Sequence, residues 1–320
     1  MKILLLELSG SDSCSRKPNR YAGAGPSLRR LAENIDDCYL AAEKSCFEED
    51  INEKCISLSR EDITNIRNFK PLNLYLFGSG YDVLVYSDHN IVLNTEKPQI
   101  CWAVGANEKI NPEIKHLLLH NAKWQQPIIQ NSETKIYEFV LGIDTLAFEE
   151  RNKRDIVFQC SNHYYQIGSD VLAYWCRHNK ITAMFAGPIS KDFEKDFLKQ
   201  IDYEYTFYLS QISEGEKIKL LNEAKVYAGL WTHQINGPTL GVKQALSYGC
   251  SIITTSAGIM PEVIENGVNG FIIQNEEEFV NAWKNRDIIS QKKCWNKSND
   301  WSTEKMVNSF KLVVEEVIKS

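Results

Sequence analysis

Two amide side chains that bracket a predicted helix start are the first candidates for chemistry in this sequence. Asn236 and Gln244 lie eight positions apart in INGPTLGVKQALSYG, and Gly237 and Pro238 stand between them. Proline suits a first helical turn, because its missing N–H is not needed there. At such a start the free amides point outward with the positive end of the helix dipole behind them, which predicts a phosphate site. The amides concerned are those of Thr239, Leu240 and Gly241.

The loop that follows the first predicted strand is a second candidate binding segment. It reads SGSDSCSRKPNRYAGAGP and carries three cations, Arg16, Lys17 and Arg20. Gly23 and Gly25 would let the backbone approach a ligand closely. The loop is also unusually long, since most strand-to-helix loops have about 2–6 residues, and such length needs an explanation.

Histidine supplies the candidate proton carriers. His163 follows a predicted strand and His233 follows another, so both are expected at the carboxyl ends of strands. His116 and His120 are four apart in a segment predicted to be a helix, 111–122, where they would share a face as metal ligands do. Because no third ligand has matching spacing, no metal site is predicted.

The elements that must position these residues alternate between short apolar runs and helical patterns, which is typical of parallel α/β layers. In the second half the runs are apolar without strict alternation, so the sheet is expected to be covered on both faces. The predicted strands there are 155–160, 181–187, 205–210, 225–231, 251–256 and 270–274. The predicted helices lie near 169–179, 190–200, 214–223, 238–248 and 261–265.

The first half is similar but less regular. A helix is predicted from Pro26, and apolar periodicity stops near residues 143–153, where we place the domain boundary. A closing amphipathic helix is predicted beyond Ser302, with Met306 and Phe310 on its apolar stripe. The predicted strands are 2–8, 38–43, 55–59, 72–77, 82–87, 99–104, 127–130 and 135–140.

Composition limits the function classes. At 320 residues the chain is expected to form two domains. A net charge of −6 argues against nucleic acid as the main partner. Nine cysteines without a Cys-x-x-Cys indicate reduced thiols in a cytoplasmic protein. The opening MKILLLELSG is too short for a leader or a membrane span and is better explained by a first strand.

Several of these segments together resemble a known family. NGPTLGVKQALSYGCSIITTSAGIMPEVIENGVNGFII is similar to the donor-binding region of retaining glycosyltransferases of the GT-B fold. LGIDTLAF, EAKVYAGLW and NDWSTEKMVNSF resemble the family's linker, the strand before its donor loop and its closing helix, in the same order. The resemblance implies two Rossmann-like doubly wound α/β domains facing across a cleft, with a C-terminal helix crossing back. The expected domains are 1–145 on the acceptor side, 146–300 for the nucleotide sugar, and 301–320 as the closing helix.

The resemblance also implies a reaction. A sugar would move from a nucleotide sugar, such as a UDP-, GDP- or ADP-sugar, to an acceptor with retention and without a metal or other cofactor. The family's two donor-site glutamates are Asn236 and Gln244 here, at the sugar and ribose positions. Its two diphosphate cations fall at Asn162 and Ile167, with Gly168 retained.

We hypothesise that other cations replace the missing pair. Lys243, His163 and the cations of the first-domain loop are the replacements available. Asn236 and His163 are therefore the candidate catalytic residues. The candidate donor-binding residues are Gly23, Gly25, Asn162, Gly237, Pro238, Thr239, Leu240, Gly241, Lys243 and Gln244.

Several alternatives stay open at this point. The acceptor is a lipid-linked or polysaccharide precursor, a protein or a small metabolite, and Arg29 and Arg30 would permit peripheral membrane association. A second interpretation is a catalytically silent GT-B-like protein that binds a glycan or partners an active glycosyltransferase. A third is an enzyme that isomerises or hydrolyses a nucleotide sugar.

Overall fold

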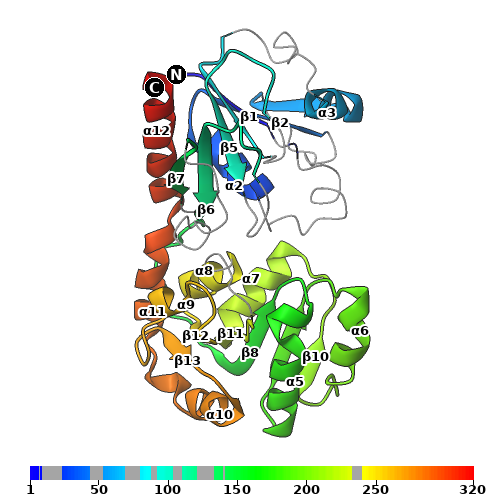
Figure 1. The fold of residues 1–320 in the computed structure, drawn as a ribbon. Coiled ribbons are helices and arrows are strands. Elements are labelled where there is room, and N and C mark those ends of the chain that lie inside the picture. Colours follow the sequence, from blue (N-terminus) through cyan, green and yellow to red (C-terminus); the bar gives the residue numbers. More distant parts are fainter. Residues whose placement is uncertain are drawn as a thin grey trace. The chain divides into compact units, whose positions relative to one another are not determined.

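The chain folds into two compact units, each with its own parallel sheet (Figure 1). The first unit is Met1–Gly142 with Thr303–Ser320, and the second is Ile143–Ser302. The computed structural model describes residues 1–6, 8, 24–43, 53–68, 80–87, 92–103, 110–120, 133–139, 141–232 and 240–320.

The first unit contains a seven-stranded sheet in the order β3-β2-β1-β4-β5-β6-β7, with every described pairing parallel. The first strand is central, because Ile3 is in register with Cys38 on one side and with Val83 on the other. All four residues of that strand are buried, as expected for a sheet covered on both faces. The strands are β1 Ile3–Leu6, β2 Cys38–Glu43, β3 Cys55–Leu58, β4 Val83–Tyr86, β5 Gln99–Ala103, β6 His116–His120 and β7 Lys135–Phe139.

Helices cover both faces of this sheet. On one face, α2 (Ala24–Asn34) and α12 (Thr303–Lys319) share a single buried cluster with the strands. The ring of Phe310 on α12 lies 6.0 Å from that of Phe139 on β7. On the other face, α3 (Arg60–Arg67) contributes Ile63 and Ile66 to a second cluster. The C-terminal helix therefore belongs to the first unit, as the resemblance to the GT-B fold implies.

The second unit contains a six-stranded parallel sheet in the order β10-β9-β8-β11-β12-β13. Both sheets thus share the doubly wound order in which the third, second and first strands are followed by the fourth, fifth and sixth. The strands are β8 Arg154–Cys160, β9 Ala183–Ala186, β10 Thr206–Tyr208, β11 Ala224–Gly229, β12 Ser251–Thr254 and β13 Gly270–Ile272.

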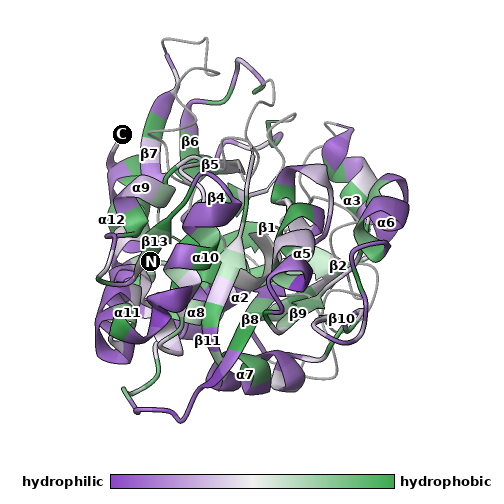
Figure 2. Cartoon of the chain, turned by 90° about the horizontal axis from the view of Figure 1, so that it is seen from below, coloured by the Kyte–Doolittle hydropathy of each residue, from purple (hydrophilic) through white to green (hydrophobic). Residues whose placement is uncertain are grey.

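The second sheet is also covered on both faces. One face packs against α5 (Ser169–His178), α6 (Lys191–Leu198) and α10 (Glu276–Lys284) in a common buried cluster. The helices α7 (Glu214–Glu223) and α8 (Leu240–Ser247) contact the strands, and α11 (Gln291–Ser298) packs on α8. The hydrophilic surface of α11 is plain in Figure 2, while its Cys294 is buried. The short helices are α9 Met260–Val263, η4 Tyr165–Ile167, η5 Arg286–Ile288 and η6 Asn299–Trp301.

All six strands predicted in the second half are present, and so are the five helices predicted between them. The helix predicted at 111–122 is wrong, because residues 116–120 form β6. Leu117, Leu118 and Leu119 are all buried in this central strand, and so short an apolar run does not distinguish helix from strand. Four residues along a strand span about 13 Å, so His116 and His120 cannot share a metal ion.

Three helices were missed by the periodicity argument, namely α3, α10 and α11. Two of them carry capping signals that would have revealed them. Ser59 and Asp62 form a reciprocal capping box before α3, and the Asn275 side chain accepts from the Glu278 amide at the start of α10. The strands predicted at 72–77 and 127–130 lie outside the described residues.

Candidate functional site

The second sheet has a switch point between β8 and β11. The chain runs outward from β8 through β9 to β10, then returns to β11 on the other side of β8. The loops that leave β8 and β11 therefore diverge at their carboxyl ends, which is where ligands bind in open parallel sheets. The amide of Thr232 donates to the carbonyl of Gln166 at 3.0 Å, so the two loops are joined directly.

Gly168 makes this junction sterically feasible. Its φ is +65°, a conformation that favours glycine, and an added Cβ would lie 2.4 Å from the carbonyl oxygen of Leu230. Gly168 ends the short η4 helix and precedes α5, so it sets how the loop after β8 meets the end of β11.

Helix α8 begins on the same strand ends. The Tyr227 hydroxyl donates to the carbonyl of Cys160 at 2.8 Å, and a Cβ on Gly241 would lie 2.2 Å from that hydroxyl. Only glycine allows the first turn of α8 to rest there. Within the described chain nothing accepts from the amides of Leu240 and Gly241, and the first turn has no acidic residue to neutralise the helix dipole.

One turn further along α8, Gln244 is half-buried. Its backbone carbonyl accepts from Tyr248 and Ser247, whereas its side-chain amide has no hydrogen bond to any described residue. Leu240 and Gln244 are four apart, so they share a helix face. Three amides that have no hydrogen-bond partner among the described residues therefore lie on one helix at the switch point.

His163 does not fit the catalytic role predicted for it. It is fully buried, its Nε2 donates to the Ala186 carbonyl at 3.0 Å, and its Nδ1 accepts from the Ser169 hydroxyl at 2.7 Å. Its ring stacks on Phe197 at 5.0 Å. Burial lowers the pKa of His163 to about 4, partly offset by the hydrogen bond to Ala186. A neutral histidine with both nitrogens occupied cannot bind a diphosphate, so His163 is a structural residue.

Lys243 is likewise not an available cation. It is fully buried, and its Nζ lies 5.7 Å from the centre of the Trp301 ring. Burial lowers the pKa of Lys243 to about 7. The hypothesis that it replaces a diphosphate cation is wrong for this conformation, because a ligand would first have to reach a side chain with no exposed surface. Sequence position placed it beside Gln244, but neighbouring helix residues point about 100° apart.

The two positions where the resemblance expects cations differ in exposure. Asn162 is exposed at the end of β8, while Ile167 is buried with 5% of its surface exposed. Asn162 is therefore the predicted loop residue that remains available to a ligand. Gly25 lies in the first turn of α2. The following predicted residues lie outside the described residues: Arg16, Lys17, Arg20, Gly23, His233, Asn236, Gly237, Pro238 and Thr239.

Three buried polar side chains at these strand ends were not predicted. Both amide atoms of Gln159, the Ser161 hydroxyl and the Trp231 indole N–H are buried without a hydrogen-bond partner. Gln159 is fully buried on β8 in register with Phe185 of β9. Buried polar groups usually have partners, so such a group needs an explanation. A glutamine inside the apolar run DIVFQC was the signal that could have found it.

Across the described ranges, no three His, Cys, Asp or Glu side chains gather as a metal site. None of the helices in those ranges is long and apolar enough to cross a membrane.

The fold itself has clear relatives among solved structures. The sequence matches no known family profile and no curated protein sequence. The structure resembles AviGT4, a glycosyltransferase involved in avilamycin A biosynthesis, with a TM-score of 0.73 at 11% identity, covering 100% of this chain and 99% of that one. The chain has the GT-B fold.

Two further relatives support this GT-B assignment. A glycosyltransferase from Rickettsia africae matches with a TM-score of 0.73 at 12% identity, covering 100% of this chain and 99% of its own. Anabaena HepE in complex with UDP-glucose matches with a TM-score of 0.66 at 15% identity over 100% of both chains. These GT-B structures match this chain end to end, so the likeness extends over both units.

Proposed function

We propose that this GT-B chain is a glycosyltransferase that takes a sugar from a nucleotide-sugar donor. The observation that carries the proposal is the start of α8 at the switch point. There Gly241 rests on the Tyr227 hydroxyl, and the backbone amides of Leu240 and Gly241 and the side-chain amide of Gln244 have no hydrogen-bond partner among the described residues. The solved relatives include one bound to UDP-glucose, which supports a nucleotide sugar as the donor class.

Each group has a defined task in this proposal. The amides of Leu240 and Gly241 donate to the donor's diphosphate at the positive end of the α8 dipole. Gln244 hydrogen-bonds the ribose hydroxyls, and the exposed amide of Asn162, which follows β8, is a further donor ligand in the proposal. The bond from the anomeric carbon to the diphosphate oxygen breaks, a bond to the acceptor oxygen forms, and the acceptor proton leaves with the diphosphate. Retention of configuration and independence of metal are part of the proposal.

The binding part of the proposal is tested by titrating UDP, GDP and ADP into the protein calorimetrically. Gln244→Ala should weaken binding, whereas Gln244→Glu should tighten it about fivefold, because a charge-assisted hydrogen bond replaces a neutral one. Gln274→Ala, an exposed glutamine after β13, is the matched control and should leave affinity unchanged. If no nucleoside diphosphate binds, the catalytically silent alternative is supported instead.

The reaction is tested separately from binding. Incubation with nucleotide sugars should release nucleoside diphosphate slowly without an acceptor and faster with one. Proton NMR of the product reports the anomeric configuration, and a chelator should leave the rate unchanged. An inverted product or loss of activity with chelator would correct those parts while leaving glycosyl transfer intact.

A further inference from the structure

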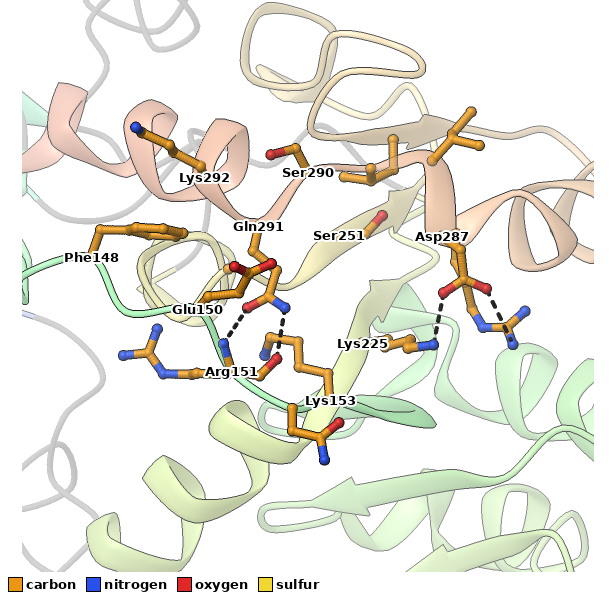
Figure 3. A pocket seen from close by; sticks show the side chains of 15 residues that line it. Phe148, Glu150, Arg151, Lys153, Lys225, Ser251, Asp287, Ser290, Gln291 and Lys292 are labelled. Atoms are coloured by element: carbon orange, nitrogen blue, oxygen red, sulfur yellow. Dashed lines mark hydrogen bonds and ion pairs between the residues drawn. The ribbon is translucent and has the colours of Figure 1, made fainter.

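A pocket of about 700 Å³ lies in the second unit, at the edge opposite the carboxyl ends of its strands (Figure 3). Lys153 precedes β8, Lys225 lies near the start of β11, and Ser251 is the first residue of β12. The remaining wall is the segment from η5 into α11. This pocket is separate from the switch point and does not depend on the proposed glycosyl transfer.

The charge of the lining is predominantly positive. It contains five cationic side chains and two carboxylates, Glu150 and Asp287. Asp287 is neutralised within the wall, because Lys225 binds it at 2.7 Å and also binds Asp155 at 2.8 Å. Glu150 is exposed, so its carboxylate is free to turn into water. The cations are Arg151, Lys153, Lys225, Arg286 and Lys292.

Two of these cations, Lys153 and Arg151, have no carboxylate partner among the described residues. Lys153 donates to the carbonyls of Leu221 and Ala224 at 2.8 and 2.9 Å, so its charge is held in the wall by neutral groups. Arg151 donates to a backbone carbonyl and lies over the Tyr248 ring at 5.3 Å. The positive charge of the wall is thus only partly compensated by the chain itself.

The start of α11 adds two hydrogen-bond donors to this wall. Ser290 makes no side-chain cap, no acidic residue stands in the first turn, and Lys292 is exposed there. In the residues that the structure describes, nothing accepts from the amides of Gln291 and Lys292. A lysine and bare amides at the positive end of a helix repel one another unless an anion lies between them.

Gln291 locks this helix start to the pocket floor. Its side chain accepts from the amide of Arg151 at 3.1 Å and donates to the carbonyl of Arg151 at 2.8 Å (Figure 3). Gly249 permits the approach, since an added Cβ there would lie 3.0 Å from the Gln291 side chain. Two hydrogen bonds therefore join the start of α11 to the segment before β8 in the pocket wall.

Ser251 provides an independent sign of a missing ligand. It is 3% exposed, and its hydroxyl has no hydrogen-bond partner. It lines the pocket between Gln291 and Asp287, next to the segment that leads into α11 (Figure 3). An unpaired buried hydroxyl destabilises the fold, which is expected where a ligand normally completes the hydrogen bond.

We propose that this pocket binds a phosphate-class oxyanion, held by the α11 amides, the Ser251 hydroxyl and the surrounding cations. Oxyanions of this class accept several hydrogen bonds at once and match a helix start flanked by lysine and arginine. The sheet places the pocket and the switch point at opposite ends of the same strands, so the two sites can be occupied together.

The proposal is tested by titrating the full chain with inorganic phosphate at constant ionic strength while recording amide NMR spectra. Shifts are expected at Gln291, Lys292 and Ser251. Lys292→Gln should raise the phosphate Kd about tenfold, as one charge-assisted bond is lost. Lys293→Gln, the exposed neighbour outside the pocket, is the matched control and should change it less than about twofold.

Two more variants test the sign of the effect. Glu150→Gln should tighten phosphate binding, because it removes the exposed carboxylate from the lining. Ser251→Ala should keep or raise the melting temperature without phosphate, and should reduce the rise that phosphate causes. This pattern separates a lost ligand contact from a damaged fold.

The source of the phosphate group is distinguished by a second probe. Binding to phosphatidic acid vesicles, lost in Lys292→Gln, would identify a lipid headgroup, and free phosphate binding without vesicle binding would identify a soluble ligand. The proposal is overturned if neither probe moves the pocket amides, if Lys292→Gln and Lys293→Gln weaken binding equally, or if shifts occur only at Leu240 and Gly241.

Discussion

The Tyr227 hydroxyl donates a 2.8 Å hydrogen bond to the carbonyl of Cys160, and this bond joins the ends of β11 and β8 on the two sides of the switch point. Tyr227 is almost fully buried, so the bond is protected from water. Gly241 rests on the same hydroxyl. One buried side chain therefore fixes both the strand ends and the start of α8.

Gly241→Ala should destabilise the protein by roughly 1–3 kcal/mol, because the new methyl group would overlap the Tyr227 hydroxyl. Adding Tyr227→Phe should recover part of that loss by removing the oxygen. Gly215→Ala, in α7 with open space around it, is the control and should stabilise by about 0.5–1 kcal/mol. Urea denaturation measures the stability of all three variants. A denaturation midpoint that Gly241→Ala leaves unchanged would contradict the close contact between Gly241 and the Tyr227 hydroxyl.

Stability should fall as the pH is lowered from about 6.5 towards 4 because of His163. The pKa of His163 is lowered from 6.5 to about 4 in the folded protein, so between these values the unfolded chain binds more protons. The contribution is fully present above pH 6.5 and is on the order of 3 kcal/mol.

Denaturation midpoints across this range measure the effect of His163. His163→Gln should flatten the slope. An unchanged slope in His163→Gln would show that other groups carry the pH dependence.

Gln159→Leu should raise the free energy of unfolding by about 1–2 kcal/mol, because it removes two buried polar atoms that have no partner. Gln200→Leu is the matched comparison and should lower the free energy of unfolding. The side-chain oxygen of Gln200 accepts a hydrogen bond from Arg177 at 2.9 Å, and this bond would be lost. A loss of stability in Gln159→Leu would instead indicate that the Gln159 side chain has a hydrogen-bond partner, such as a bound molecule at the switch point.

Lys153→Met should cost roughly 2–3 kcal/mol of stability. The apolar stem stays, but the carbonyls of Leu221 and Ala224 lose the ammonium donor and keep only the weaker Cys250 thiol. Lys284→Met, at an exposed position on α10, should stay within about 0.5 kcal/mol. Equal effects in a thermal melt would mean that Lys153 contributes no more than a surface lysine.

The layers could be predicted from local patterns, and the exceptions have physical causes. The apolar runs predicted as strands in the second half all form strands. Strands of a parallel sheet are buried on both faces and therefore have continuous apolar sequences. HLLLH became β6 because a short apolar run fits either period, and only pairing with β5 and β7 settled it. Helix α3 was visible only through its cap, Ser59 and Asp62.

The candidate site was predictable in position but not in chemistry. By itself the sequence determined which segments of the second half form strands and that a helix starts near Gly241. Both depend on residue type and short-range spacing. Only the tertiary structure decided that His163 and Lys243 are buried and that Gln244 is not, because solvent exposure depends on which distant elements pack against each side chain. The basic pocket around Ser251 arises the same way, from three strand starts and one helix that are far apart in the chain.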